Sequence, residues 1–116
     1  MRNVFVTLVG LTIATSVVAA QAPDAAKVAA GQKIYEAQKC NTCHMIQGKG
    51  GKLASSLDGV GGKLSQADIK KWLTDSAAME KNLKEKPKMP MSTFMKSHKL
   101  SDADVDALTA YMMSLK

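Results

Sequence analysis

The amino-acid sequence predicts an all-α domain with three main helices. Apolar residues recur at helical spacing in two long stretches, residues 24–39 and 101–116, and in a shorter one that follows Ser65. No segment shows the alternation of apolar and polar residues that a half-buried strand requires. The chain has 116 residues, which is the length of one domain preceded by a short amino-terminal segment.

That amino-terminal segment has the pattern of a secretory signal peptide. Arg2 precedes an apolar run over residues 4–18, and small residues follow, namely Ala19, Ala20 and Ala22. We expect residues 1–20 to be cleaved off, with cleavage after Ala22 as a second possibility, so that residues 21–116 form a single domain. An uncleaved membrane anchor is the alternative, because the apolar run approaches the length of a short span.

The first helix is predicted over residues 24–39. Its apolar face contains Val28, Gly31, Ile34 and Tyr35 at helical spacing. Glycine lowers the stability of a helix, so its presence at position 31 requires a reason. We expect that Gly31 lets another helix approach the backbone closely.

Cys40-Asn41-Thr42-Cys43-His44 comes directly after this helix and contains the only two cysteines of the chain. Two thiols at this spacing lie on one side of a turn, where both can add to the vinyl groups of a haem, and the histidine is then delivered to the iron. The motif predicts one covalent haem c, attached through Cys40 and Cys43, with His44 as the proximal ligand. Such attachment is completed outside the cytoplasm in bacteria, so motif and signal peptide together predict a periplasmic protein.

Three other interpretations of the cysteine pair are weaker. A thioredoxin-type redox pair requires a strand leading into the motif, and none is indicated. A zinc site would have to combine Cys40, Cys43 and His44 with the distant His98, a spacing that matches no common zinc pattern. A structural disulfide would close so small a loop that it could stabilise little.

The middle of the chain contains one further clear helix. A glycine-rich loop extends over residues 48–62, and Ser65 followed by Asp68 then marks a helix start. Three residues form its apolar face, namely Ile69, Trp72 and Leu73, and it fades near Asp75. Residues 77–99 are irregular and are interrupted by Pro87 and Pro90.

The last helix begins at a Ser101 cap. Asp102 and Asp104 lie in its first turn and Lys116 at its end, charges that complement the helix dipole. Its predicted buried stripe comprises Val105, Leu108, Tyr111, Met112 and Leu115.

This order of helices, C-x-x-C-H motif, glycine-rich loop, Met-Pro loop and capped last helix resembles a small monohaem class I cytochrome c. The resemblance covers essentially all of residues 21–116. It implies the cytochrome c fold, in which the first and last helices cross and the chain wraps around one covalent haem. Gly31 with Tyr35, and Leu108 with Tyr111, match the pairs that face each other at this crossing.

The resemblance also implies a methionine as the distal iron ligand. Met89, in Lys88-Met89-Pro90, matches the Met-Pro motif of the family, and Met91 in the same loop is the runner-up. Other methionines are more simply explained as packing around the haem. His98 would give a bis-histidine haem of lower potential, but its polar neighbours favour a solvated surface position.

One position departs from the family pattern. Ser55 stands where related sequences often have a proline whose carbonyl accepts a hydrogen bond from the proximal histidine. We expect the backbone carbonyl of Ser55 to remain available for His44.

These features predict an electron carrier and not an enzyme, because an iron with two axial ligands leaves no open site. Lysines near the haem-binding segments would steer it to acidic docking patches on redox partner proteins, namely Lys39, Lys49, Lys52, Lys86 and Lys88. We expect a monomer without nucleic-acid partners, capable of loose association with a membrane surface. The alternatives are an electron-transfer subunit of a larger dehydrogenase or oxidase complex, and a five-coordinate gas-binding or peroxidatic haem protein.

The composition predicts that the fold depends on the haem. Residues 21–116 contain only four aromatic side chains, namely Tyr35, Trp72, Phe94 and Tyr111, which is little for the core of a small domain. We therefore expect the chain without haem to show weak helical circular dichroism and no cooperative thermal transition. A cooperative transition in the apoprotein would contradict this prediction.

Overall fold

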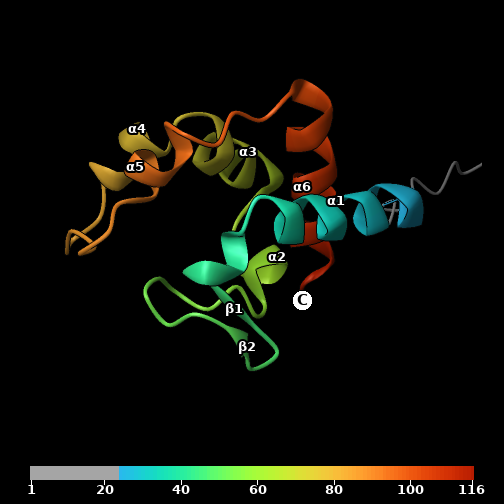
Figure 1. Ribbon diagram of the computed structural model, residues 1–116, viewed down its shortest axis with the longest axis horizontal. Coiled ribbons are helices and arrows are strands. Elements are labelled where there is room, and N and C mark those ends of the chain that lie inside the picture. The colour runs from blue at the N-terminus through green and yellow to red at the C-terminus, as the bar shows by residue number, and fades with distance from the viewer. Residues whose placement is uncertain (1–23) are drawn as a thin grey trace, which may run out of the picture.

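The computed structural model describes residues 24–116, so the predicted signal peptide lies outside the described part of the chain. Two helices are long, α1 (Ala25–Ala37) and α6 (Asp102–Ser114). Four are short: α2 (Val60–Lys63), α3 (Gln66–Thr74), α4 (Ser76–Glu80) and α5 (Met91–Met95). A 3-10 turn, η1 (Cys40–Thr42), follows α1, and two short strands, β1 (Met45–Ile46) and β2 (Lys49–Gly50), come next (Figure 1).

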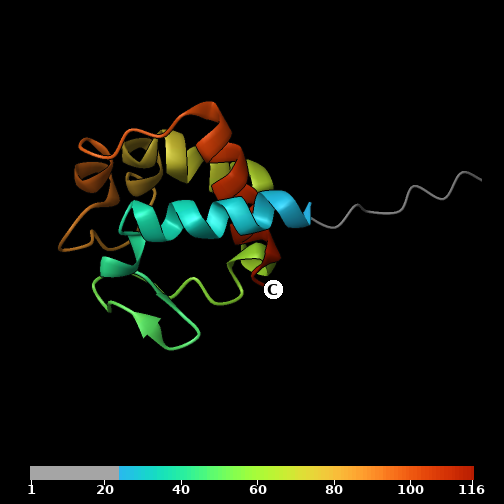
Figure 2. The ribbon, with the colours of Figure 1, turned by 45° about the vertical axis from the view of Figure 1, so that its right-hand side comes forward.

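The two long helices cross and form the centre of the fold (Figures 1 and 2). At the crossing Gly31 is buried, and a Cβ atom on it would lie 2.1 Å from the backbone oxygen of Ala107. Beside it the rings of Tyr35 and Tyr111 meet edge to face, with centroids 5.8 Å apart. The close approach predicted for Gly31 and the crossing of the first and last helices are both confirmed.

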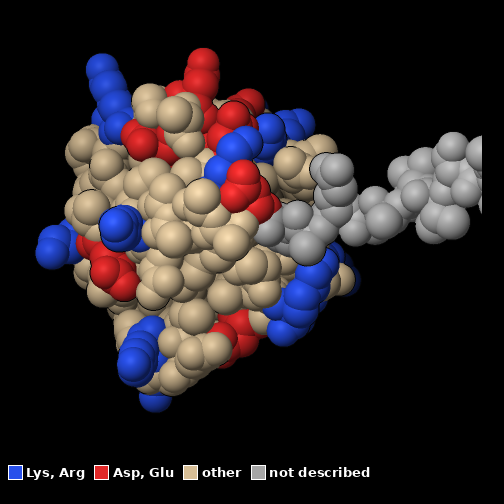
Figure 3. Space-filling view, turned by 90° about the vertical axis from the view of Figure 1, so that its right-hand side faces the viewer, with Lys and Arg blue, Asp and Glu red and all other residues tan. Residues whose placement is uncertain are grey.

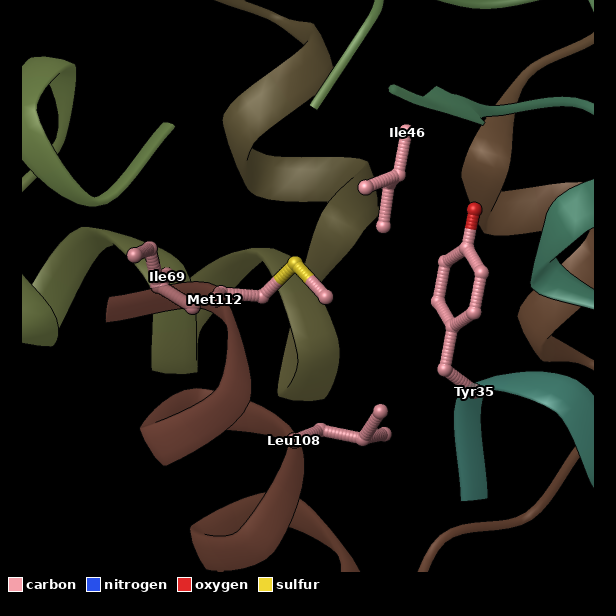
Figure 4. Close-up of a cluster of buried hydrophobic side chains, with 5 residues drawn as sticks. All are labelled: Tyr35, Ile46, Ile69, Leu108 and Met112. Carbon is pink, nitrogen blue, oxygen red and sulfur yellow. The ribbon is translucent and has the colours of Figure 1, made fainter. Parts of the chain in front are cut away.

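The core lies where α1, α3 and α6 meet the hairpin (Figure 4). Five buried side chains form it: Tyr35, Ile46, Ile69, Leu108 and Met112. In Figure 4 the Tyr35 ring faces Leu108 and Met112 from across the crossing, and Ile46 lies near its hydroxyl end. The core thus extends from the crossing toward the segment that follows Cys43.

Capping residues set the starts of the helices as the sequence predicted. Ser65 Oγ accepts a hydrogen bond from the backbone N–H of Asp68 at the start of α3. Ser101 and Asp104 form a reciprocal capping box at the start of α6, which satisfies two backbone N–H groups that the helix leaves free. Asp75 ends α3 and caps α4.

Three expectations about the middle of the chain were wrong. The expected absence of strands fails at β1 and β2, which pair antiparallel across a turn in which Gln47 and Gly48 have positive φ. Two-residue strands are too short to show an alternating pattern. The glycine-rich loop contains α2, and the irregular stretch 77–99 contains most of α4 and all of α5. Each of these helices is only one or two turns long, so periodicity could not reveal them.

The predicted stripe of the last helix is largely confirmed. Val105, Leu108 and Met112 are buried, whereas Tyr111 and Leu115 are half-buried. Ala107 and Thr109 are buried as well, and the Thr109 hydroxyl donates to the backbone oxygen of Val105. Of these two, Ala107 lies at the close crossing, where its backbone meets Gly31.

Gly31 offers a direct test of the crossing. We expect Gly31→Ala to lower the free energy of unfolding of the haem-loaded protein by about 2 kcal/mol or more, because the added Cβ must displace the backbone of α6. Gly62→Ala is the matched control: no atom lies within 4 Å of the position that its Cβ would take, so helix propensity should leave stability unchanged or slightly higher. Urea unfolding of both variants measures the difference, and equal stabilities would contradict the tight crossing.

Candidate haem site

The C-x-x-C-H motif begins immediately beyond the carboxyl end of α1. Lys39 adopts a left-handed conformation with φ of 61°, which ends the helix and turns the chain into η1. The backbone N–H groups of Cys43 and His44 then both donate to the oxygen of Cys40, at 3.3 and 3.1 Å. This turn holds both cysteines and the histidine within one compact unit, as the motif requires.

Both cysteine thiols are free and half-buried. Burial raises the pKa of the Cys40 thiol, outweighing a backbone hydrogen bond that lowers it. A thioredoxin-type pair requires the opposite, an attacking thiol of lowered pKa. Among residues 24–116 no three His, Cys, Asp or Glu side chains come together as a metal-ion site, so the zinc set with His98 is not assembled either.

The glycine-rich loop holds the motif in place through the backbone. The N–H of Gly51 donates to the oxygen of Asn41 at 2.8 Å, and a Cβ atom on Gly51 would overlap the oxygen of Thr42. Ala54 donates to the oxygen of Cys43 at 3.0 Å. The glycine-rich loop therefore lies directly against the motif, which explains a glycine at position 51.

His44 is oriented by a backbone carbonyl. Its Nδ1 lies 2.8 Å from the oxygen of Ser55, and because a carbonyl can only accept, Nδ1 carries the proton. Nε2 of the neutral ring is then left with its lone pair, the state that a metal ligand needs. The expectation that Ser55 supplies this bond in place of a proline is confirmed.

Tyr35 links the helix crossing to the motif. Its hydroxyl donates to the backbone oxygen of His44 at 3.3 Å, while its ring lies in the core. Burial raises the pKa of Tyr35 to about 12, with smaller contributions from the ionisable groups of Cys40 and Tyr111. The sequence indicated the ring of Tyr35 as core but gave no sign of this hydroxyl contact.

The candidate distal ligands lie in and around the loop between α4 and α5. Met89 is 51% exposed and precedes Pro90, which has φ of −64° and leads into α5. Met91 opens α5 and is half-buried. An exposed thioether next to a conformationally fixed proline is available for a ligand bond, so the chemistry of Met89 fits the distal position.

His98 is held more firmly than a solvated surface histidine would be. Its ring stacks on Phe94 with centroids 3.7 Å apart, and its Nδ1 lies 2.9 Å from the oxygen of Phe94. The side chain is half-buried. The expected surface position therefore holds only in part, because Phe94, one helical turn earlier, stacks against the imidazole.

A family model described as cytochrome c matches residues 28–116. The chain belongs to the cytochrome c family. Neither the comparison with curated proteins nor that with solved structures found a significant match. Membership implies a covalent haem c and haem-based electron transfer, which this group supplies by cycling between Fe(II) and Fe(III).

The residues of this cytochrome c domain fit that group. One C-x-x-C-H turn presents two free thiols, and the adjacent imidazole is held with Nε2 available. Three large apolar side chains are exposed within residues 24–116, namely Leu53, Leu83 and Met89. Leu53 lies in the loop that follows the motif, and Leu83 and Met89 lie in the loop that precedes α5. In the same range no helix is long and apolar enough to cross a membrane.

The raised pKa of Tyr35 predicts a stability difference at high pH. Because its folded pKa of about 12 exceeds the ordinary value of 10.0, the uncharged phenol stabilises the fold fully below pH 10, and this contribution is lost as the pH rises toward 12. Between these pH values we expect the wild-type protein to lose about 1–2 kcal/mol more unfolding free energy than Tyr35→Phe. Guanidinium unfolding at several pH values measures the loss, and parallel curves for the two proteins would contradict the burial argument.

Proposed function

We propose that this protein is a soluble periplasmic electron carrier with a single low-spin haem c. Cys40 and Cys43 tether the haem, His44 is its proximal ligand and Met89 its distal ligand. The observation that carries this proposal is the hydrogen bond from His44 Nδ1 to the oxygen of Ser55, which lies in the loop packed against the turn that bears both thiols. It fixes the tautomer and the orientation that permanent ligation requires.

Met89 is preferred over Met91 because of its position in the chain. Met91 is the first residue of α5, where its backbone is committed to the helix and its side chain is half-buried. Met89 lies before the helix and is exposed on the loop. A thioether in this place could bind an iron without a change in α5, and Pro90 restricts how far the loop can move away.

With both axial positions filled, we propose electron transfer without substrate chemistry, so the protein is not an enzyme. Its partners would be redox proteins that carry acidic docking patches. The five lysines near the haem-binding segments are exposed, namely Lys39, Lys49, Lys52, Lys86 and Lys88. On the face seen in Figure 3, by contrast, positive and negative side chains are interleaved.

Lysines outnumber acidic residues in these loops, where Asp58 and Glu85 are the exposed acids, and this excess favours docking through the loops; we propose that the protein docks as a monomer. Charges of one sign raise the rate of encounter with an oppositely charged partner, whereas interleaved charges cancel at a distance. Within residues 24–116 the one salt bridge joins Lys70 and Asp106, away from these loops. The loop lysines therefore remain free to meet an acidic partner or to rest loosely on an anionic membrane surface.

The absorption spectrum of the haem-loaded protein tests the ligand set. We expect narrow bands of a low-spin c haem in the reduced form and a far-red methionine-to-iron band in the oxidised form. Met89→Ala should abolish the far-red band, because the thioether is lost, whereas Met91→Ala should retain it.

Two other results would contradict the proposal. Retention of the band in Met89→Ala and its loss in Met91→Ala would move the ligand to Met91. High-spin features or prompt carbon monoxide binding by the wild-type protein would show an open iron, as expected of a gas-binding or peroxidatic haem protein.

A further inference from the structure

The loop of residues 81–90, which contains Met89, has few bonds of its own. At its start the backbone N–H groups of Asn82 and Leu83 donate to Met79 and Glu80. Residues 84–89 form no hydrogen bond with any residue that the structure describes. A cavity of about 360 Å³, lined partly by Glu80, Lys86 and Pro90, separates the loop from α4. The loop is therefore held mainly at its two ends.

Glu80 joins these two ends. It is the last residue of α4, and its carboxylate accepts two hydrogen bonds from Ser92 in the first turn of α5. The backbone N–H of Ser92 lies 2.9 Å from Oε1, and its hydroxyl lies 2.6 Å from Oε2. Both side chains are half-buried, so these bonds are partly shielded from water. We call this pair of residues the Glu80–Ser92 clasp.

The clasp contains a charge, which makes it stronger than an ordinary side-chain contact. Burial raises the pKa of Glu80, but hydrogen bonds from the side chain and backbone of Ser92 and the backbone of Met91 outweigh it, so that the pKa is lowered overall. Lys81 and Lys86 line the same cavity and add positive charge nearby. Hydrogen bonds to an ionised carboxylate are stronger than those between neutral groups, and this carboxylate accepts two of them.

We propose that Glu80 is a positioning residue for the distal iron ligand. Through Ser92 it fixes the start of α5, and Pro90, whose ring allows little rotation, carries this restraint to the preceding Met89. This inference rests on the proposed function, in which Met89 binds the iron. Without the clasp the loop opens more often, and an external ligand can take the distal position in proportion to the open fraction.

Imidazole titration of the oxidised, haem-loaded protein measures this open fraction. Glu80→Ala should raise the apparent association constant for imidazole about tenfold, which corresponds to about 1.4 kcal/mol. It should also lower the reduction potential, because a thioether ligand raises it. Ser92→Ala should give a smaller rise, since the backbone N–H of Ser92 still donates, and Ser92→Thr should restore the wild-type value.

Glu85→Ala is the matched control. Glu85 lies in the loop of residues 81–90, is exposed and accepts no hydrogen bond from residues 24–116. Its replacement therefore changes the net charge of the protein as much as Glu80→Ala does, without loosening the clasp. Its imidazole affinity and potential should match those of the wild type. Glu80→Gln, which keeps the shape of the side chain but not its charge, should lie between wild type and Glu80→Ala and serves if the alanine variant does not fold.

The outcomes separate this inference from the proposed function. If Met89→Ala raises imidazole affinity but Glu80→Ala behaves as Glu85→Ala does, the positioning role is overturned and Met89 remains the ligand. If Met89→Ala leaves imidazole affinity unchanged, the distal assignment fails and the positioning role falls with it. Larger effects in Glu80→Ala than in Glu85→Ala, together with a wild-type imidazole affinity in Ser92→Thr, support the inference.

Discussion

Helices α1 and α6 cross closely at Gly31, and the positions of the core and of the haem-attachment turn follow from this crossing. The contact of the bare Gly31 backbone with Ala107 brings the helices near enough for Tyr35 and Tyr111 to meet ring to ring. Since α1 ends only a few residues before Cys40, the crossing also sets where the haem attachment turn begins. Tyr35 then extends from the core to the backbone of His44, so the same side chain packs in the core and contacts the haem site.

The proximal and distal sides of the proposed haem site are built differently. On the proximal side, His44 is surrounded by backbone hydrogen bonds from the motif turn and the glycine-rich loop, and its ring is bound by the carbonyl of Ser55. On the distal side, Met89 lies on an exposed loop fixed by Pro90 and the Glu80–Ser92 clasp. A covalent tether and a rigid turn suit a permanent ligand, whereas a weaker thioether bond from Met89 would depend on how well its loop is held.

Much of this arrangement could be predicted from the sequence because it depends on residue type and spacing. The C-x-x-C-H spacing, the Ser101 capping box and the glycine at position 31 each have a local physical cause that the sequence displays. The hairpin, α2, α4 and α5 could not be predicted, because segments this short have no measurable periodicity and form through contacts with the rest of the chain. The bond to Ser55 could be expected despite the missing proline, since a backbone carbonyl is present at every residue. The Glu80–Ser92 clasp could not be predicted, because no local sequence pattern relates these two residues.

Proton NMR of the reduced, haem-loaded protein would show whether Met89 is the second iron ligand beside His44. A methionine methyl group held over the porphyrin experiences the ring current and is shifted far upfield. With selectively methyl-labelled methionine, we expect one such resonance, which disappears in Met89→Ala and persists in Met91→Ala. The absence of any upfield methionine methyl in the wild-type protein, or its survival in Met89→Ala, would contradict the assignment of Met89 as the distal ligand.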